Sequence, residues 1–93
     1  MLSQIPINLD KLKREDLEKE ILRVGIIAEL DAINLYEQLA AMAKNESTKK
    51  VLLDIAKEEK THMGEFLALL LREDSQQVEE LEEGKKEVGE LTG

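Results

Sequence analysis

The sequence predicts an all-α fold, an antiparallel two-helix hairpin followed by a short C-terminal helix. Three observations support this fold class. Leu, Ala, Glu and Lys, which favour helices, are abundant, and the 93 residues include only one Pro. Apolar residues recur at helical spacing along two long segments, with a single break at 45–47 between them. Because that connection is so short, the two helices should be antiparallel neighbours.

The two long helices are predicted from their periodic patterns and the residues that end them. Residues 1–12 are expected to form an extended lead-in, and the first helix should cover 13–44. The second helix is predicted over 48–72. Asn45 suits the end of the first helix and Ser47 suits the N-cap of the second.

A third helix is predicted with a weaker pattern. Asp74 or Ser75 can cap it, and it is expected over 75–84, where apolar positions are few. Residues 85–93 are glycine-bearing and acidic, and are expected to form a linker or tail. The whole chain, 1–93, has the size of a single small domain.

Composition limits the possible functions and partners. The net charge of −8 argues against nucleic acid as a partner. Residues 73–93 hold eight acidic and two basic side chains, so most of this charge lies near the C-terminus. The longest apolar run, 66–71, is too short for a membrane span, and no signal peptide is evident, so we expect a cytoplasmic chain. Without cysteine there is no thiolate metal site, and with 2% aromatic residues oligomerisation is expected to complete the core.

Each long helix carries an apolar stripe that polar residues interrupt. In the first helix the interruption is Glu29. In the second, Glu59 and His62 occupy stripe positions where packing alone would favour Leu. The stripe residues themselves are Leu22, Ile26, Ile33, Tyr36, Ala40 and Ala43 in the first helix and Leu52, Ile55, Ala56, Met63, Phe66, Leu67, Leu69 and Leu70 in the second.

The interruptions are expected to meet. Glu29 precedes the turn by about 17 residues and His62 follows it by about 16, so both should lie roughly 25 Å from the turn. Carboxylates converge in a core chiefly when a cation lies between them. Carboxylate oxygens with one imidazole suit iron or manganese. Glu58 lies one turn before His62 and is the rival of Glu59 as a ligand, but the stripe favours Glu59.

The chain has only half of a di-iron site. Glu59 and His62 form one Glu-x-x-His motif, and His62 is the single histidine in the sequence. A carboxylate-bridged di-iron site in a ferritin-like four-helix bundle uses four carboxylates and two histidines. Two copies of this chain around a two-fold axis supply that set. We therefore expect a homodimer that binds two iron ions at its interface.

Residues 29–36 and 58–62 resemble the encapsulated ferritin family, and the resemblance extends over about residues 26–72. It implies a ferroxidase that oxidises Fe(II) to Fe(III) at a di-iron site on the dimer interface. It also implies that the dimers assemble into a ring-shaped decamer. The family works inside an encapsulin nanocompartment, as cargo or as a domain fused to the shell protein, and the shell stores the iron mineral.

The resemblance also implies roles for single residues. The three residues that interrupt the stripes would be the iron ligands. Tyr36 matches a tyrosine beside the site, and Asp31 matches one of two acidic positions that attract metal ions to it. Ala28 stands at the other acidic position, and Leu35 stands where a tryptophan is usual. Residues 84–93 show no clear version of the peptide that targets cargo to the shell.

Two alternative functions remain open from the sequence. An acidic helical hairpin could dimerise as a non-catalytic scaffold, because a Glu-x-x-His motif on a Glu-rich helix is more often a surface salt-bridge pair than a metal site. A di-iron module of rubrerythrin type would use similar chemistry, but such proteins normally carry both Glu-x-x-His motifs in one chain. Asp31, Glu58 and Glu65 are otherwise expected to be solvated charges.

Overall fold

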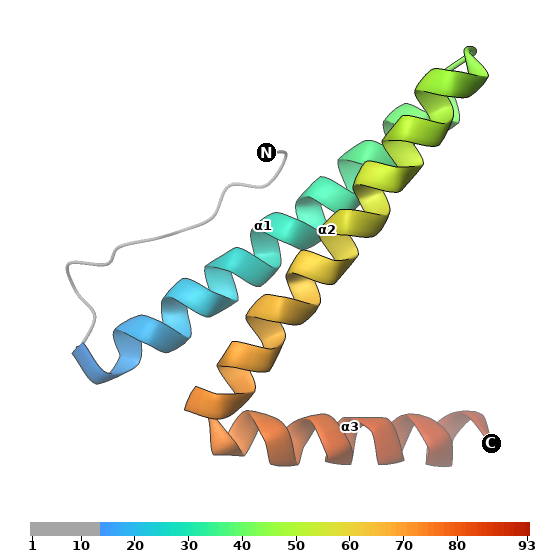
Figure 1. The fold of residues 1–93 in the computed structure, drawn as a ribbon. Coiled ribbons are helices and arrows are strands. Elements are labelled where there is room, and N and C mark those ends of the chain that lie inside the picture. Colours follow the sequence, from blue (N-terminus) through green and yellow to red (C-terminus); the bar gives the residue numbers. More distant parts are fainter. Residues whose placement is uncertain (1–13) are drawn as a thin grey trace.

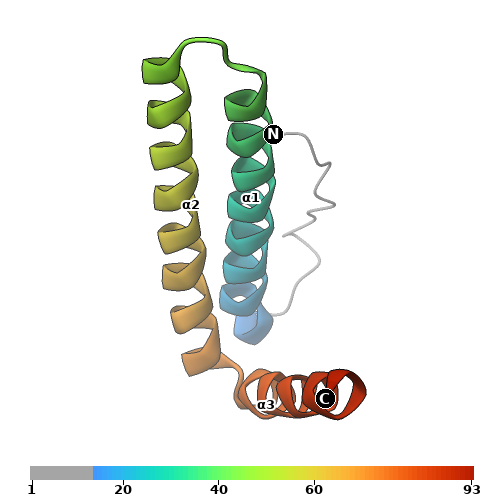
Figure 2. The same ribbon diagram turned by 90° about the vertical axis from the view of Figure 1, so that its right-hand side faces the viewer.

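The computed structural model describes residues 14–93, which form three helices. They are α1 (Arg14–Met42), α2 (Glu46–Glu73) and α3 (Ser75–Thr92). α1 and α2 lie side by side as an antiparallel hairpin, and α3 leads away from the open end of that hairpin (Figures 1 and 2). The predicted all-α fold with a two-helix hairpin is confirmed. The lead-in predicted for residues 1–12 lies outside the described residues.

The turn between α1 and α2 differs slightly from the prediction. The backbone N–H of Ala43 donates to the carbonyl of Leu39 at 3.0 Å and closes α1. Asn45 has an extended backbone, and its side-chain oxygen accepts a hydrogen bond from the backbone N–H of Thr48 at 3.0 Å. Asn45 is therefore the N-cap of α2, and Ser47, which was expected to be the cap, lies inside the first turn.

Asp74 joins α2 to α3 and orients the third helix. Its carboxylate accepts from the backbone N–H of Gln77 at 3.1 Å, which makes it the N-cap of α3, one of the two caps predicted. The same carboxylate accepts from the guanidinium of Arg23 on α1 at 3.0 Å. One side chain therefore caps α3 and ties its first turn to the hairpin.

α3 is longer than the sequence predicted. It continues through Gly84 and Gly89 to Thr92, whereas the helix was expected over 75–84 with a linker or tail over 85–93. Gly93, with a φ of 91°, is the C-cap of α3, and its backbone N–H donates to the carbonyl of Gly89 at 3.0 Å. The prediction overestimated the power of isolated glycines to end a helix whose other residues favour it.

The hairpin has a thin core. Within the described residues, α3 buries no side chain, and twelve large apolar side chains of the chain are exposed. A Cβ atom on Gly25 would lie 3.0 Å from a ring carbon of Phe66, so the glycine lets that ring pack against α1. None of the helices in residues 14–93 is long and apolar enough to cross a membrane. The buried apolar side chains are Leu22, Ile33, Ala40, Ala56 and Leu70, all of them predicted stripe residues.

Candidate metal centre

The three residues that interrupt the apolar stripes meet at the middle of the hairpin. Glu29 comes from α1, and Glu59 and His62 come from α2, with one possible ligand atom of each within 4.8 Å of the others. The Nδ1 atom of His62 lies 3.7 Å from Oε2 of Glu29 and 3.5 Å from Oε2 of Glu59. The expectation that these residues lie at the same height along the two helices is thus met by their distances.

The two carboxylates are largely removed from water. The side chains of Glu29 and Glu59 are 17% and 20% exposed, whereas that of His62 is 48% exposed. Oε2 of Glu29 is buried and has no hydrogen-bond partner among residues 14–93. The pKa of Glu29 is raised above its ordinary value of 4.5, first by the neighbouring carboxyl of Glu59 and then by burial, while His62 acts in the opposite sense. Among the described residues no Lys or Arg forms an ion pair with Glu29 or Glu59, so the site concentrates carboxylates around one imidazole.

This donor set fits a hard divalent metal ion. It offers two carboxylate oxygens and one imidazole nitrogen, which suit iron or manganese, and it contains no sulfur ligand. The partly exposed imidazole forms the open side of the cluster, while the carboxylates lie deeper between the helices. One chain thus brings together two carboxylates and one histidine, which is half of the set that a ferritin-like di-iron site uses.

The other predicted residues lie around this cluster or away from it. Glu58 is exposed and does not belong to the cluster. Tyr36 is half-buried and follows Glu29 by two helical turns, about 10 Å along α1. Asp31 is only 8% exposed, which corrects the expectation of a solvated charge open to arriving ions.

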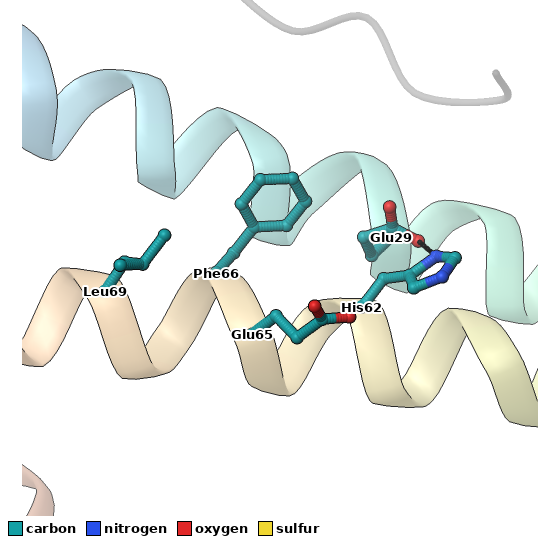
Figure 3. A pocket seen from close by; sticks show the side chains of 5 residues that line it. All are labelled: Glu29, His62, Glu65, Phe66 and Leu69. Atoms are coloured by element: carbon teal, nitrogen blue, oxygen red, sulfur yellow. Dashed lines mark ion pairs between the residues drawn. The ribbon is translucent and has the colours of Figure 1, made fainter.

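Sequence reasoning missed a cleft that opens beside the cluster. It has a volume of about 420 Å³ and adjoins the exposed side of His62 (Figure 3). Glu65 is exposed, as expected of a solvated charge, and it lies at this cleft. The available signal was its position three residues after His62, which places both on one face of α2. The residues that line the cleft are Glu29, His62, Glu65, Phe66 and Leu69.

Comparisons with known proteins identify relatives of the chain. A family model described as rubrerythrin matches residues 20–92. A ferritin-like-encapsulin shell fusion protein of Pyrococcus furiosus is 58% identical over 95 residues, which cover all of this chain and 28% of that protein. An encapsulin nanocompartment cargo protein of Myxococcus xanthus is 39% identical over 67 residues, which cover 72% of this chain and 51% of that protein. The chain therefore spans about a quarter and about a half of the length of these two relatives.

A solved structure matches over nearly the whole length of both chains. The crystal structure of the encapsulated ferritin domain from Pyrococcus furiosus superposes with a TM-score of 0.86 at 57% sequence identity. The match covers 100% of this chain and 97% of that one. Since fold, sequence and the rubrerythrin family model agree, the chain belongs to the encapsulated ferritin family of the ferritin-like (rubrerythrin) superfamily.

Proposed function

We propose that the chain is a ferroxidase that oxidises Fe(II) to Fe(III) at a di-iron site shared by two copies of the chain. One observation carries the proposal. Glu29, Glu59 and His62 converge within 4.8 Å at the middle of the hairpin, and they amount to half of a ferritin-like site. A second protomer packed against this face would bring the other half. Two iron ions would then lie at the dimer interface.

Charge and ligand hardness explain why this set would favour oxidation. Four carboxylates from two chains carry four negative charges, which match two Fe(II) ions, the substrate. Carboxylate oxygens hold the harder ferric ion more strongly than the ferrous ion. Each Fe(II) would give up one electron, and one dioxygen molecule with two protons would be reduced to hydrogen peroxide. The His62 of each chain would bind one iron through a nitrogen of its neutral imidazole.

The relatives indicate the compartment in which this oxidation would take place. One is a ferritin-like domain fused to an encapsulin shell, and another is a cargo protein of an encapsulin nanocompartment. We infer that this chain likewise works inside an encapsulin nanocompartment, as cargo or as a fused domain, and feeds iron storage there. Its dimers would assemble further, into a ring-shaped decamer. The exposed apolar side chains of the hairpin and α3 are available for such contacts.

Replacing the three cluster residues one at a time tests the proposed ferroxidase. Glu29→Ala, Glu59→Ala and His62→Ala should each lower aerobic Fe(II) oxidation at least about tenfold, because each removes a ligand. Far-UV circular dichroism should show that helicity is kept. Glu58→Ala is the matched control, because Glu58 is the exposed neighbour of Glu59 and lies outside the cluster. It should oxidise Fe(II) at the wild-type rate.

Other results would point to other functions. Wild-type oxidation rates in all three cluster variants would overturn the ferroxidase and leave the non-catalytic scaffold. Loss of activity in Glu58→Ala and not in Glu59→Ala would show that Glu58, and not Glu59, is the iron ligand. Faster turnover with hydrogen peroxide than with dioxygen would favour the rubrerythrin type of chemistry. Native mass spectrometry with and without Fe(II) should find one iron per chain in an even-numbered oligomer.

A further inference from the structure

A glycine and an aromatic ring face each other one helical turn from the cluster. Gly25 precedes Glu29 by four residues on α1, and Phe66 follows His62 by four residues on α2. Because the two helices are antiparallel (Figure 2), both positions lie on the side of the cluster toward the open end of the hairpin. Figure 3 shows the ring of Phe66 directed toward α1, next to Glu29 and His62. A close contact between the helices thus adjoins the candidate ligands.

The contact between Gly25 and Phe66 leaves no room for a side chain on α1. A Cβ atom at Gly25 would lie 3.0 Å from Cδ1 of the ring and 3.1 Å from Cδ2 and Cε1, so the ring lies face-on to the glycine. Alanine there would force the ring or the helix to move by a few tenths of an ångström. Glycine in the interior of a helix such as α1 also costs stability relative to alanine. The close approach of the ring, and not the helix itself, therefore explains this glycine.

The cluster does not hold the two helices together without a metal ion. Glu29 and Glu59 come from opposite helices, and two charged carboxylates at this distance repel each other. The packing on either side of the cluster must therefore keep α1 and α2 close. Toward the turn, the buried side chains of Ile33 and Ala56 fill the space between the helices. Toward the open end, the ring of Phe66 fills it.

We propose that Gly25 is a positioning residue, which sets the separation of α1 and α2 beside the metal centre through its contact with Phe66. At that separation Glu29, on α1, comes within reach of the two ligands on α2. The ligands of a metal site must be held within about 0.5 Å of their productive geometry, so a shift of a few tenths of an ångström at this level weakens binding. The inference rests on the proposed ferroxidase and adds the packing that holds its half-site together.

Gly25→Ala tests the positioning role. The added methyl group displaces the ring into the cleft beside His62 or moves α1 away from α2, and either movement disturbs the ligands. Anaerobic titration with Co(II) should give a Kd about three- to tenfold higher than that of the wild type. The d–d absorption spectrum of bound Co(II) should change, and kcat for Fe(II) oxidation should fall. Far-UV circular dichroism should show full helicity, because alanine favours a helix more than glycine does.

Two further variants make this test specific. Phe66→Leu removes the ring face that meets the new methyl group. Adding Gly25→Ala to Phe66→Leu should therefore change the Co(II) Kd by less than about twofold, since the two substitutions act on one contact and are not additive. Gly84→Ala is the matched control, because it makes the same substitution inside α3, where a Cβ atom would have no neighbour within 4 Å. It should keep the Co(II) affinity and spectrum of the wild type.

The possible results are distinct. Wild-type Co(II) affinity and spectrum in Gly25→Ala would overturn the positioning role and leave the proposed ferroxidase intact. An equal loss of affinity with and without the Phe66 ring would also overturn it, because Gly25 would then act through the backbone of α1 alone. A wild type that binds no Co(II) and oxidises no Fe(II) would overturn the proposed ferroxidase, and the positioning role with it.

Discussion

The carboxylate of Glu29 lies in surroundings that folding alone would not favour. One of its oxygens is buried without a hydrogen-bond partner in the described part of the chain, and the carboxyl of Glu59 faces it. Leu at this stripe position would pack between the helices without any such cost. Unfavourable polar residues kept inside an otherwise consistent packing pattern are typical of functional sites. The candidate metal centre therefore has a measurable consequence for stability, apart from any catalysis.

Glu29→Gln should stabilise the metal-free protein at neutral pH. Because the pKa of Glu29 is raised in the folded state, stability from this group is fully present below its ordinary pKa of 4.5 and is lost as pH rises through the raised pKa. Above that raised pKa the wild type carries a largely buried charged carboxylate, and the neutral amide of the variant avoids a cost of about 1–3 kcal/mol. Thermal denaturation of metal-free protein should give the variant a higher Tm at pH 7 and nearly the same Tm at pH 4.

Two comparisons make this prediction specific. Glu58→Gln removes the same charge from an exposed position, and should change the free energy of unfolding by less than about 0.5 kcal/mol. Anaerobic Fe(II) should reverse the order, because the wild type gains stability by binding the ion. A metal-free Glu29→Gln protein no more stable than the wild type at pH 7 would contradict the account.

Single residues show which features of the site could be predicted from the sequence and which could not. The stripe pattern selected Glu59 over Glu58, and the structure places Glu59 in the cluster and Glu58 outside it. The stripe pattern could make this choice because helical periodicity alone decides which of two adjacent residues faces the partner helix. The burial of Asp31 and the cleft at Glu65 depend on which surfaces remain open after packing, and periodicity carries no information on that.

At the scale of elements, the long helices were easier to predict than the third. α1 and α2 have sustained apolar stripes, and their observed bounds differ from the predicted ones by one or two residues. α3 has few apolar residues and two internal glycines, each of which costs about 1 kcal/mol relative to alanine. That cost is offset by strong helix formers around them and by pairs such as Glu82 and Lys86, four residues apart.

The junction of α2 and α3 should be sensitive to acid through Asp74. The pKa of Asp74 lies below its ordinary value of 3.8, first because the Gln77 N–H donates to it and then because of the Arg23 guanidinium. A depressed pKa contributes stability that is present above the ordinary value and is lost as pH falls through the folded-state pKa. Helical circular dichroism of the wild type should therefore fall below about pH 4 as α3 loses its charged cap.

Asp74→Asn provides the test of this junction, because Asn is as good an N-cap as Asp but carries no charge. The variant should lose the bond to Arg23 at every pH, so its helicity should be lower than that of the wild type at pH 7 and should fall less on acidification. Glu79→Gln, an exposed single-charge change on α3, should keep the acid response of the wild type. Identical acid curves for the wild type and Asp74→Asn would contradict the role given to Asp74.

The whole molecule has more apolar surface than a two-helix core can cover. Within the described residues only five apolar side chains are buried, while twelve large ones are exposed. The face that carries the half-site also carries Leu69, an exposed side chain that lines the cleft. The candidate metal centre and an exposed apolar side chain therefore lie together. The proposed dimer would complete the metal site and cover the apolar surface at the same time. Dimerisation and Fe(II) oxidation should therefore depend on each other.

Leu69→Asp should separate the dimer and stop Fe(II) oxidation without touching a ligand. Leu69 is 45% exposed, so the hairpin should keep its helicity when this residue is replaced. A charge buried against a second protomer has no partner there and strongly disfavours association. The added carboxylate attracts cations, so lost oxidation could not be ascribed to repulsion of Fe(II). Sedimentation velocity and aerobic oxidation should therefore report a smaller species and a loss of activity together.

Leu53→Asp is the matched control for this coupling. Leu53 is also 45% exposed and lies on α2, but sixteen residues from Leu69 it points to a different face of that helix. The variant should keep the two-chain unit and most of the oxidation rate, because the face with Glu29, Glu59 and His62 is unchanged. A Leu69→Asp protein that sediments as a monomer and still oxidises Fe(II) at the wild-type rate would show that one chain suffices. In that case the single histidine of the sequence would have to serve a site of a different kind, and the shared di-iron centre would be wrong.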